Sequence, residues 1–151
     1  MTGPLSRRRM LGLTAAVAGL ALLPVSRAMA TPDAVADEIA GFANGQTPQS
    51  GKIRLLISER VENGSAVPVT IEVDSAMEGD DRVDSIMLLG EENPNPIVAT
   101  FHFSALSGTA TVSTRVRLAA TQKVVAVARM ADGSVWRDER EVDVAIGGCV
   151  T

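Results

Sequence analysis

The sequence has little of what an enzyme active site or a disulfide framework needs. Its 151 residues include one cysteine, Cys149, and one histidine, His102. A single cysteine cannot close an internal disulfide, so the fold must depend on its hydrophobic core. A single histidine has no second ligand of its kind, and we interpret His102 as a polar position on a strand. Without a second cysteine or a grouping of histidine with carboxylates, a redox or hydrolytic site within this chain is disfavoured.

The sequence also lacks an apolar run of the roughly 20 residues that a membrane-spanning helix requires. The run at residues 11–23 is too short, follows three arginines at positions 7–9 and precedes the small-residue motif Ala28-Met29-Ala30. A charged start, a short apolar segment and a small-residue site are typical of a signal peptide. Paired arginines of this kind resemble a twin-arginine export signal. We therefore expect residues 1–30 to be removed and the mature chain to lie in the bacterial periplasm.

Positive charge is scarce in the expected mature chain. Residues 1–30 contain four arginines and no acidic residue, which leaves 10 Lys+Arg against 18 Asp+Glu and a net charge of −8. Such a balance opposes binding to nucleic acid or to an anionic membrane surface. It also disfavours an open site that concentrates small anions.

One short helix is predicted before a series of strands. Residues 32–44 place Val35, Ile39 and Phe42 on one helical face, and Gly45 ends the pattern. From residue 52 onward, β-branched runs alternate with turn signals. The predicted strands are residues 52–61, 67–73, 83–89, 98–103, 110–118, 123–130 and 135–146.

Several details of these strands can be tested. Asn63-Gly64 and Asp132-Gly133 each predict a hairpin turn. Pro68 cannot donate a backbone hydrogen bond, which indicates an edge strand or the start of a strand. Alternation in residues 110–118 turns Ser113, Arg115 and Arg117 outward. The nearly continuous apolar run at residues 123–130 predicts a central strand.

Seven short strands at regular spacing predict an all-β fold, an immunoglobulin-like antiparallel β-sandwich with a short N-terminal helix. Residues 31–146 would form the sandwich, and residues 147–151 a mobile C-terminal arm. Glycine lacks a Cβ atom, so Gly147 and Gly148 are the predicted hinge of that arm.

The arm carries the free thiol. An unpaired cysteine in an exported protein suggests intermolecular pairing or a reactive thiol. A thiol reacts as the thiolate, and its activation needs a nearby cation, histidine or helix N-terminus. The residues around Cys149 offer none, and Asp143 would oppose ionisation if it lay close. We expect Cys149 to be a modest nucleophile until a partner activates it.

An ordered set of motifs resembles the SoxY family, the sulfur carriers of the periplasmic thiosulfate-oxidising (Sox) complex. The motifs are Glu62-Asn63-Gly64, Asn93-Pro94-Asn95-Pro96 with Val98-Ala99-Thr100-Phe101, residues 113–119, Asp132-Gly133-Ser134 and Ile146-Gly147-Gly148-Cys149. One departure is clear, because family members typically end Gly-Gly-Cys-Gly-Gly whereas Val150-Thr151 follow the cysteine here.

The resemblance implies a carrier subunit, and no enzyme, with Cys149 as the covalent attachment point for the substrate. The thiol would hold sulfur intermediates, an S-thiosulfonate and a persulfide, without another cofactor or a metal. The implied partners are SoxZ in a heterodimer, and the c-type cytochrome SoxAX, the hydrolase SoxB and the sulfur dehydrogenase SoxCD in transient complexes.

Other interpretations stay open. The chain could be a periplasmic scaffold whose cysteine forms an intermolecular disulfide. Trp136 is expected to pack in the core or an interface. Glu78 and Asp80-Asp81 lack the ligand spacing of a calcium loop and read as a solvated face. Partner contact and ordinary solvation are equally plausible for Arg115 and Arg117.

Overall fold

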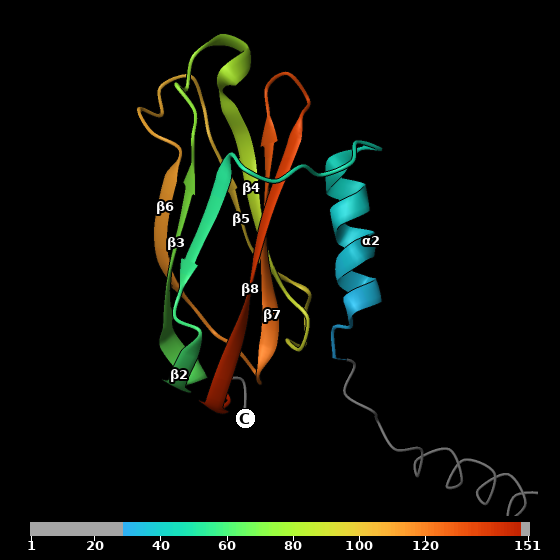
Figure 1. Ribbon diagram of the computed structural model, residues 1–151, viewed down its shortest axis with the longest axis vertical. Coiled ribbons are helices and arrows are strands. Elements are labelled where there is room, and N and C mark those ends of the chain that lie inside the picture. Colours follow the sequence, from blue (N-terminus) through green and yellow to red (C-terminus); the bar gives the residue numbers. More distant parts are fainter. Residues whose placement is uncertain (1–28, 149–151) are drawn as a thin grey trace, which may run out of the picture.

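The computed structural model describes residues 29–148. Two β-sheets pack face to face, and one helix lies against the outer face of the larger sheet (Figure 1). The elements are α2 (Pro32–Ala43), β1 (Ile53–Ile57), β2 (Arg60–Asn63), η1 (Gly64–Ala66), β3 (Val67–Val73), η2 (Gly79–Asp81), β4 (Val83–Gly90), β5 (Ile97–His102), β6 (Thr111–Val116), β7 (Gln122–Met130) and β8 (Val135–Ile146). Residues 1–28 of the predicted export signal (residues 1–30), Cys149, Val150 and Thr151 lie outside the described residues.

The strand order confirms the predicted β-sandwich. The smaller sheet has the order β1-β3-β6 and the larger has β2-β8-β7-β4-β5. Side chains that alternate along the strands fill the space between the sheets, with Ile71, Ile86 and Leu88 fully buried. In β6 and the turn after it, Ser113, Arg115 and Arg117 are exposed while Val116 and Leu118 are buried, as the alternation predicts.

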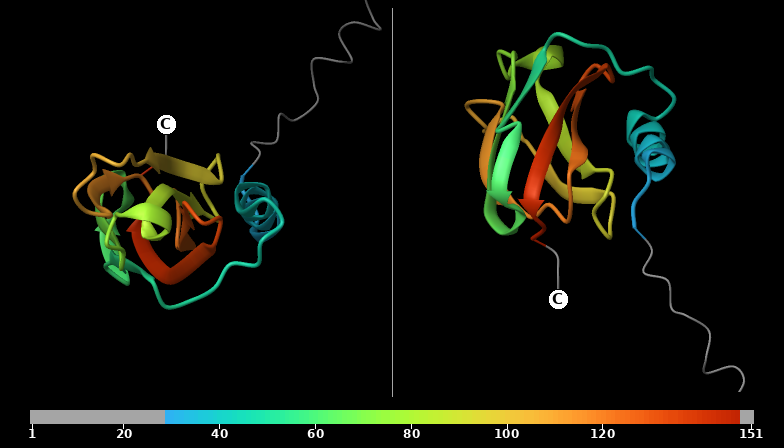
Figure 2. Two further views of the ribbon diagram at one scale, coloured as in Figure 1. Left: turned by 90° about the horizontal axis from the view of Figure 1, so that it is seen from above. Right: turned by 60° about the horizontal axis from the view of Figure 1, so that its bottom comes forward.

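The helix explains why two strands are apolar on both faces. Thr31 caps the helix, since its Oγ1 accepts a hydrogen bond from the Ala34 amide, 3.2 Å away. Val35 and Ile39 are buried against Leu89 and Val125 of the larger sheet. Figure 2 shows the helix beside that sheet. β4 and β7 are therefore covered on both sides, and the prediction of a central strand at residues 123–130 is confirmed. Within residues 29–148, no helix is long and apolar enough to cross a membrane.

One predicted hairpin is confirmed. Asp132-Gly133 joins β7 to β8, and Gly133 has a φ of 86°, which glycine adopts without strain. The Gly133 amide donates to the Met130 carbonyl, 3.1 Å away, and the Asp132 side chain accepts from the Ser134 amide, 2.7 Å away. The sequence signal and the turn agree because the turn is local.

The strand predicted at residues 52–61 is wrong as a single element. It breaks at Ser58-Glu59: β1 pairs with β3 in the smaller sheet, whereas β2 joins the larger sheet. The Glu59 carbonyl accepts from the Asp143 amide, 2.7 Å away, and this contact draws the chain across. β2 runs parallel to β8, so the sandwich is not wholly antiparallel, and the described strands number eight.

The hairpin predicted at Asn63-Gly64 is also wrong. The Asn63 side chain accepts from the Ser65 amide, 2.8 Å away, and caps the 3-10 turn η1. β2 and β3 on either side belong to different sheets. Pro68 lies in β3 beyond the last pair with β1, Ile57 with Val69, and this position fits the predicted strand start.

Candidate functional site

The last strand delivers the chain to one end of the sandwich. β8 pairs with β7 up to Val142, and its final residues pair with β2, where Val61 faces Val144 and Asn63 faces Ile146. In Figure 1, β2 and the end of β8 lie at the same end of the sandwich. The backbone is thus held by neighbouring strands until the residue before Gly147. The predicted arm therefore starts from a rigid sheet, as the sequence indicated.

Gly148 is held at the same end by two other segments. Its amide donates to the Leu118 carbonyl, 2.8 Å away, and the Leu118 amide donates to the Gly64 carbonyl, also 2.8 Å away. A Cβ atom on Gly148 would overlap the backbone of Gly64 and Ser65, and a Cβ on Gly64 would overlap the Leu118 carbonyl. Gly64 and Gly148 therefore pack so closely that no residue with a side chain fits at either position. We call Gly64, Leu118 and Gly148 the glycine clip.

The glycine clip limits movement at one of the two predicted hinge residues. In the described structure the second hinge residue, Gly148, is fixed by a hydrogen bond and by close packing. The hinge at Gly147 and Gly148 stays a prediction, and movement there would require the clip to open. Gly64 was read from the sequence as a turn residue. Its closeness to Gly148 depends on a contact over 80 residues of chain that no local pattern reports.

A substitution at Gly148 tests the clip. Gly148→Ala is expected to push the arm base off Gly64, because the added methyl has no space. Exchange of the residue-148 amide with D2O should speed up at least tenfold, measured by NMR, while the rest of the sandwich keeps its protection. Gly108→Ala is the matched control, since a Cβ there meets nothing within 4 Å. Unchanged exchange at residue 148 would show that the clip is not formed in solution.

A buried polar pair supports the loop that carries Leu118. Asn93 and Gln122 are 6% and 3% exposed. The Asn93 Oδ1 accepts from the Ala119 amide and from the Gln122 Nε2, each 2.9 Å away, and its Nδ2 donates to the Arg117 carbonyl, 3.0 Å away. This network fixes residues 117–119 and hence the partner of Gly148. The sequence showed Asn93 only as part of a turn motif.

The other predicted residues lie apart from the glycine clip. His102 is exposed at the end of β5, and its reading as a polar strand position is confirmed. Trp136 packs half-buried against the core, with its Nε1 donating to Ser134 Oγ, 3.2 Å away, which confirms the packing role. Asp143 accepts from Arg60 and Thr121 at 3.3 and 3.2 Å, so its charge is offset by the arginine.

The acidic loop after β3 is tied to the smaller sheet. Asp81 accepts from Lys52 Nζ at 2.5 Å and from the Ala76 amide at 2.8 Å. The hydrogen bond from Lys52, with that from Ala76, lowers the pKa of Asp81 below its ordinary value of about 3.8. Within the described ranges, no group of three or more potential ligands gathers in a way that could hold a metal ion. The loop is therefore a turn that these hydrogen bonds hold against the smaller sheet.

The Lys52–Asp81 pair predicts a pH-dependent stability. Because the folded-state pKa of Asp81 lies below 3.8, its contribution is complete above that value and is lost as the pH falls through the folded pKa. Asp81→Asn should lower the urea midpoint slightly at pH 7, and its deficit should shrink progressively as the pH falls below 3.8. Asp80→Asn, on the same turn, is the control and should leave the midpoint unchanged. A deficit of Asp81→Asn that does not shrink below pH 3.8 would contradict the ion-pair explanation.

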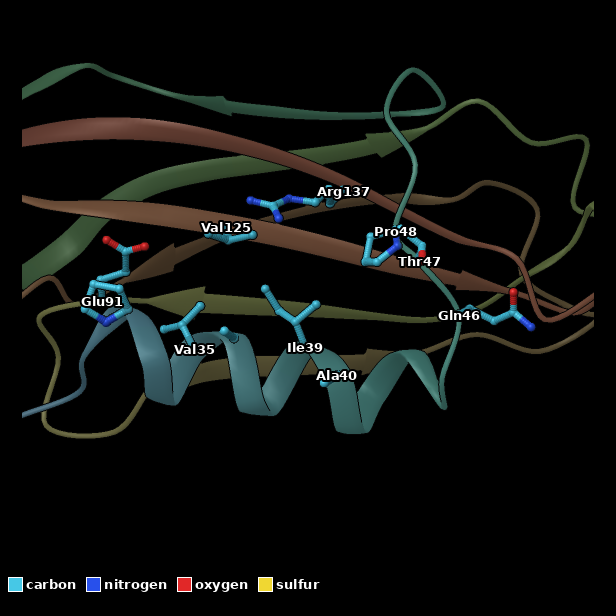
Figure 3. Close-up of a pocket in the computed structure, with 11 residues that line it drawn as sticks. Val35, Ile39, Ala40, Gln46, Thr47, Pro48, Glu91, Val125 and Arg137 are labelled. Carbon is cyan, nitrogen blue, oxygen red and sulfur yellow. The ribbon is translucent and has the colours of Figure 1, made fainter.

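A cleft lies between α2 and the larger sheet (Figure 3). Its volume is about 340 Å³, and Val35 and Ile39 point from the helix toward Val125. Glu91 and Arg137 line it as well, and no histidine or cysteine does. The lining offers apolar surface and two opposite charges.

Comparison with solved structures shows how widely the fold occurs. A superoxide reductase (neelaredoxin) from Ignicoccus hospitalis matches with a TM-score of 0.52 and 17% identity, over 77% of this chain and 94% of that one. A superoxide reductase from Nanoarchaeum equitans matches with a TM-score of 0.51 and 20% identity, over 64% of this chain and 98% of that one. At such identities the likeness concerns the fold alone. No curated protein matches the chain in sequence.

A second comparison reaches the candidate site itself. The sulfur carrier protein SoxY from Chlorobium limicola f thiosulfatophilum matches with a TM-score of 0.59 and 31% identity, over 74% of this chain and 96% of that one. The sequence profile of the family described as "Sulfur oxidation protein SoxY" matches residues 39–149. That match covers the sandwich strands, the glycine clip and the terminal cysteine. The chain therefore belongs to the SoxY family of sulfur oxidation proteins.

Proposed function

We propose that this chain is a sulfur carrier of thiosulfate oxidation, which holds intermediates covalently on Cys149 and presents them to partner enzymes. The observation that carries the proposal is the family match, which runs to residue 149 and so includes the one thiol of the chain. The sulfur carrier from Chlorobium limicola supports the same role.

The geometry of the arm base supports this role. Gly148, which the glycine clip holds in place, directly precedes Cys149 in the sequence. The groups that hold Gly148 are backbone atoms of Leu118 and Gly64. Backbone amides and carbonyls form hydrogen bonds but do not ionise at neutral pH, so they cannot act as an acid or a base toward the thiol. The chain would therefore position the thiol and leave its activation to partners.

The first proposed step loads the thiol. The Cys149 thiol loses its proton, and the thiolate forms a sulfur–sulfur bond with the outer sulfur of thiosulfate. Two electrons pass to the c-type cytochrome partner, SoxAX. The product is a cysteine S-thiosulfonate.

The next steps unload the sulfur in stages. Water attacks the outer sulfone group in the hydrolase partner, SoxB, so that the bond between the two sulfurs of the former thiosulfate breaks. Sulfate and two protons leave, and a persulfide remains on Cys149. The sulfur dehydrogenase partner, SoxCD, would then oxidise the outer sulfur of that persulfide to a sulfonate group, in which three water molecules supply the oxygen atoms and six electrons pass to the dehydrogenase as six protons are released. Tethering keeps each intermediate at high effective concentration for the next partner.

The cellular compartment of the proposed reaction is inferred from the N-terminal sequence. Residues 1–30 would direct export by the twin-arginine pathway, and the mature chain would work in the periplasm. There it would form a heterodimer with SoxZ. The net charge of −8 expected after removal of that segment disfavours nucleic acid and anionic membrane surfaces as partners.

Intact mass measurement tests the proposal. The wild-type chain is recovered from the periplasm of cells grown with and without thiosulfate, and its mass is recorded before and after reduction. Growth with thiosulfate should add sulfur-containing masses that map to the C-terminal peptide and disappear with reductant. An unmodified thiol in cells that are actively oxidising thiosulfate would overturn the carrier role. A stable disulfide to another protein, without any small adduct, would instead support the scaffold interpretation.

A further inference from the structure

Two of the motifs that carry the family resemblance line one groove. The groove lies between β5 and β6 and has a volume of about 440 Å³. One wall comes from Asn93-Pro94-Asn95 and β5, and the other from residues 114–117. In the views of Figure 2, β5 (yellow) and β6 (orange) lie at neighbouring edges of the two sheets. Neither motif supplies a reacting group to the chemistry proposed at Cys149.

β5 is an edge strand without charged protection. Unpaired strand edges invite pairing with other chains and are usually guarded by charges or prolines. Of the four edge strands in the described part of the chain, three carry an arginine: Arg54 in β1, Arg60 in β2 and Arg115 in β6. β5 has neither a charged residue nor a proline. A bulge at Val98 distorts its start, but residues 99–102 pair regularly with β4 and present a regular edge.

The groove is apolar on its floor and positive on its rim. Val98 and Phe101 are half-buried against the core and line the groove. Arg115 and Arg117 are exposed on its other wall, and neither belongs to an ion pair within residues 29–148. An extended segment with apolar side chains and a carboxylate would therefore match both the floor and the rim.

A second copy of this chain fits the groove poorly. A two-fold axis that pairs β5 with β5 of another copy places the two β6 strands on the same side of the joint. Arg115 and Arg117 of one copy would then face the same arginines of the other, and like charges oppose such pairing. A different protein with acidic groups at this position has no such conflict.

We propose that a partner subunit binds this groove by adding an extended segment alongside β5, with a carboxylate next to Arg115 and Arg117. The choice of the heterodimer partner as the occupant rests on the proposed function, whereas the surface is argued from the strands and charges alone. Because Arg117 precedes Leu118, the bound subunit would lie beside the glycine clip.

Charge reversal on the rim tests the proposal. The Cys149→Ser chain is used throughout, so that sulfur chemistry does not affect the result. Arg115→Glu/Arg117→Glu should weaken binding of the SoxZ subunit from the same organism at least tenfold by calorimetry. Both arginines are exposed, and the variant should keep the wild-type circular dichroism. Arg82→Glu is the control, because Arg82 lies outside the groove and, like the rim arginines, belongs to no ion pair within residues 29–148. This variant should bind as the unchanged chain does.

Hydrogen exchange supplies a second readout. Addition of the SoxZ subunit should protect amides of residues 99–102, because a new strand satisfies the edge of β5. Loss of binding in the control variant alone, or protection at β1 or β2 instead, would overturn the proposal. Self-association of the chain through β5, seen by analytical ultracentrifugation and abolished by the rim variant, would overturn it in favour of a second copy. Failure of Cys149 to carry sulfur would leave these binding results unaffected.

Discussion

Replacing Cys149 with serine is expected to abolish thiosulfate-dependent sulfur loading completely. A serine hydroxyl cannot form the sulfur–sulfur bond, and no second cysteine exists to take over. The measurement is intact mass after incubation with thiosulfate and the partner cytochrome, together with oxygen uptake by the reconstituted system. Both signals should fall to the level seen without the carrier. Circular dichroism should be unchanged, since the last described strand ends at Ile146, before the cysteine in the sequence.

A variant of the two residues after the cysteine is the matched comparison for Cys149→Ser. Val150 and Thr151 stand where the family typically has two glycines, and β-branched side chains are bulky and stiff. The Val150→Gly/Thr151→Gly variant should load at least as fast as the wild type, because a slimmer tip enters a partner cleft more easily. Full thiosulfate oxidation by Cys149→Ser would contradict the proposed function outright.

Replacing Asn93 with alanine is expected to cost about 2–4 kcal/mol of unfolding free energy. The change leaves the Ala119 amide and the Arg117 carbonyl without their side-chain partner in a buried site. It also removes the acceptor for the Gln122 amide nitrogen. For a domain of this size the midpoint temperature should fall by about 10 °C, measured by circular dichroism or calorimetry.

Asn95 in the same motif is the control for Asn93. Its side chain accepts from the Ile97 amide, 3.0 Å away, but the residue is exposed, so water can replace the contact. Asn95→Ala should therefore cost about 1 kcal/mol or less. Equal losses of unfolding free energy in the two variants would mean that the buried hydrogen bonds around Gln122 stabilise the fold no more than an exposed turn contact does.

Sequence patterns predicted the elements whose causes are local. The helix follows from Pro32, the apolar spacing of Val35 and Ile39, and the glycine that follows its end. The hairpin at Asp132-Gly133 follows from a glycine with positive φ and a side chain that caps the turn. In each case the residues that determine the element lie within it.

The sequence-based predictions were wrong where contacts between distant parts of the chain determine the structure. The β-branched run at residues 52–61 looks continuous, but pairing with β3 and with β8 divides it between two sheets. Asn63-Gly64 has the composition of a hairpin turn, while the glycine is required by Leu118 and Gly148, which come from other parts of the chain. Asn93 reads as a turn residue because its buried partner, Gln122, lies 29 positions away. A single sequence holds no signal for these pairings.

The parallel pairing of β2 with the end of β8 has a mechanical consequence. A partner that pulls on the C-terminus applies force along β8, whose 12 residues extend about 40 Å. The hydrogen bonds to β2 and β7 lie across that direction, so many of them share the load and must shear together. A strand pulled at right angles to its own axis, along its hydrogen bonds, would instead unzip bond by bond under a smaller force. The last strand is therefore expected to stay in the sheet when force is applied at the C-terminus.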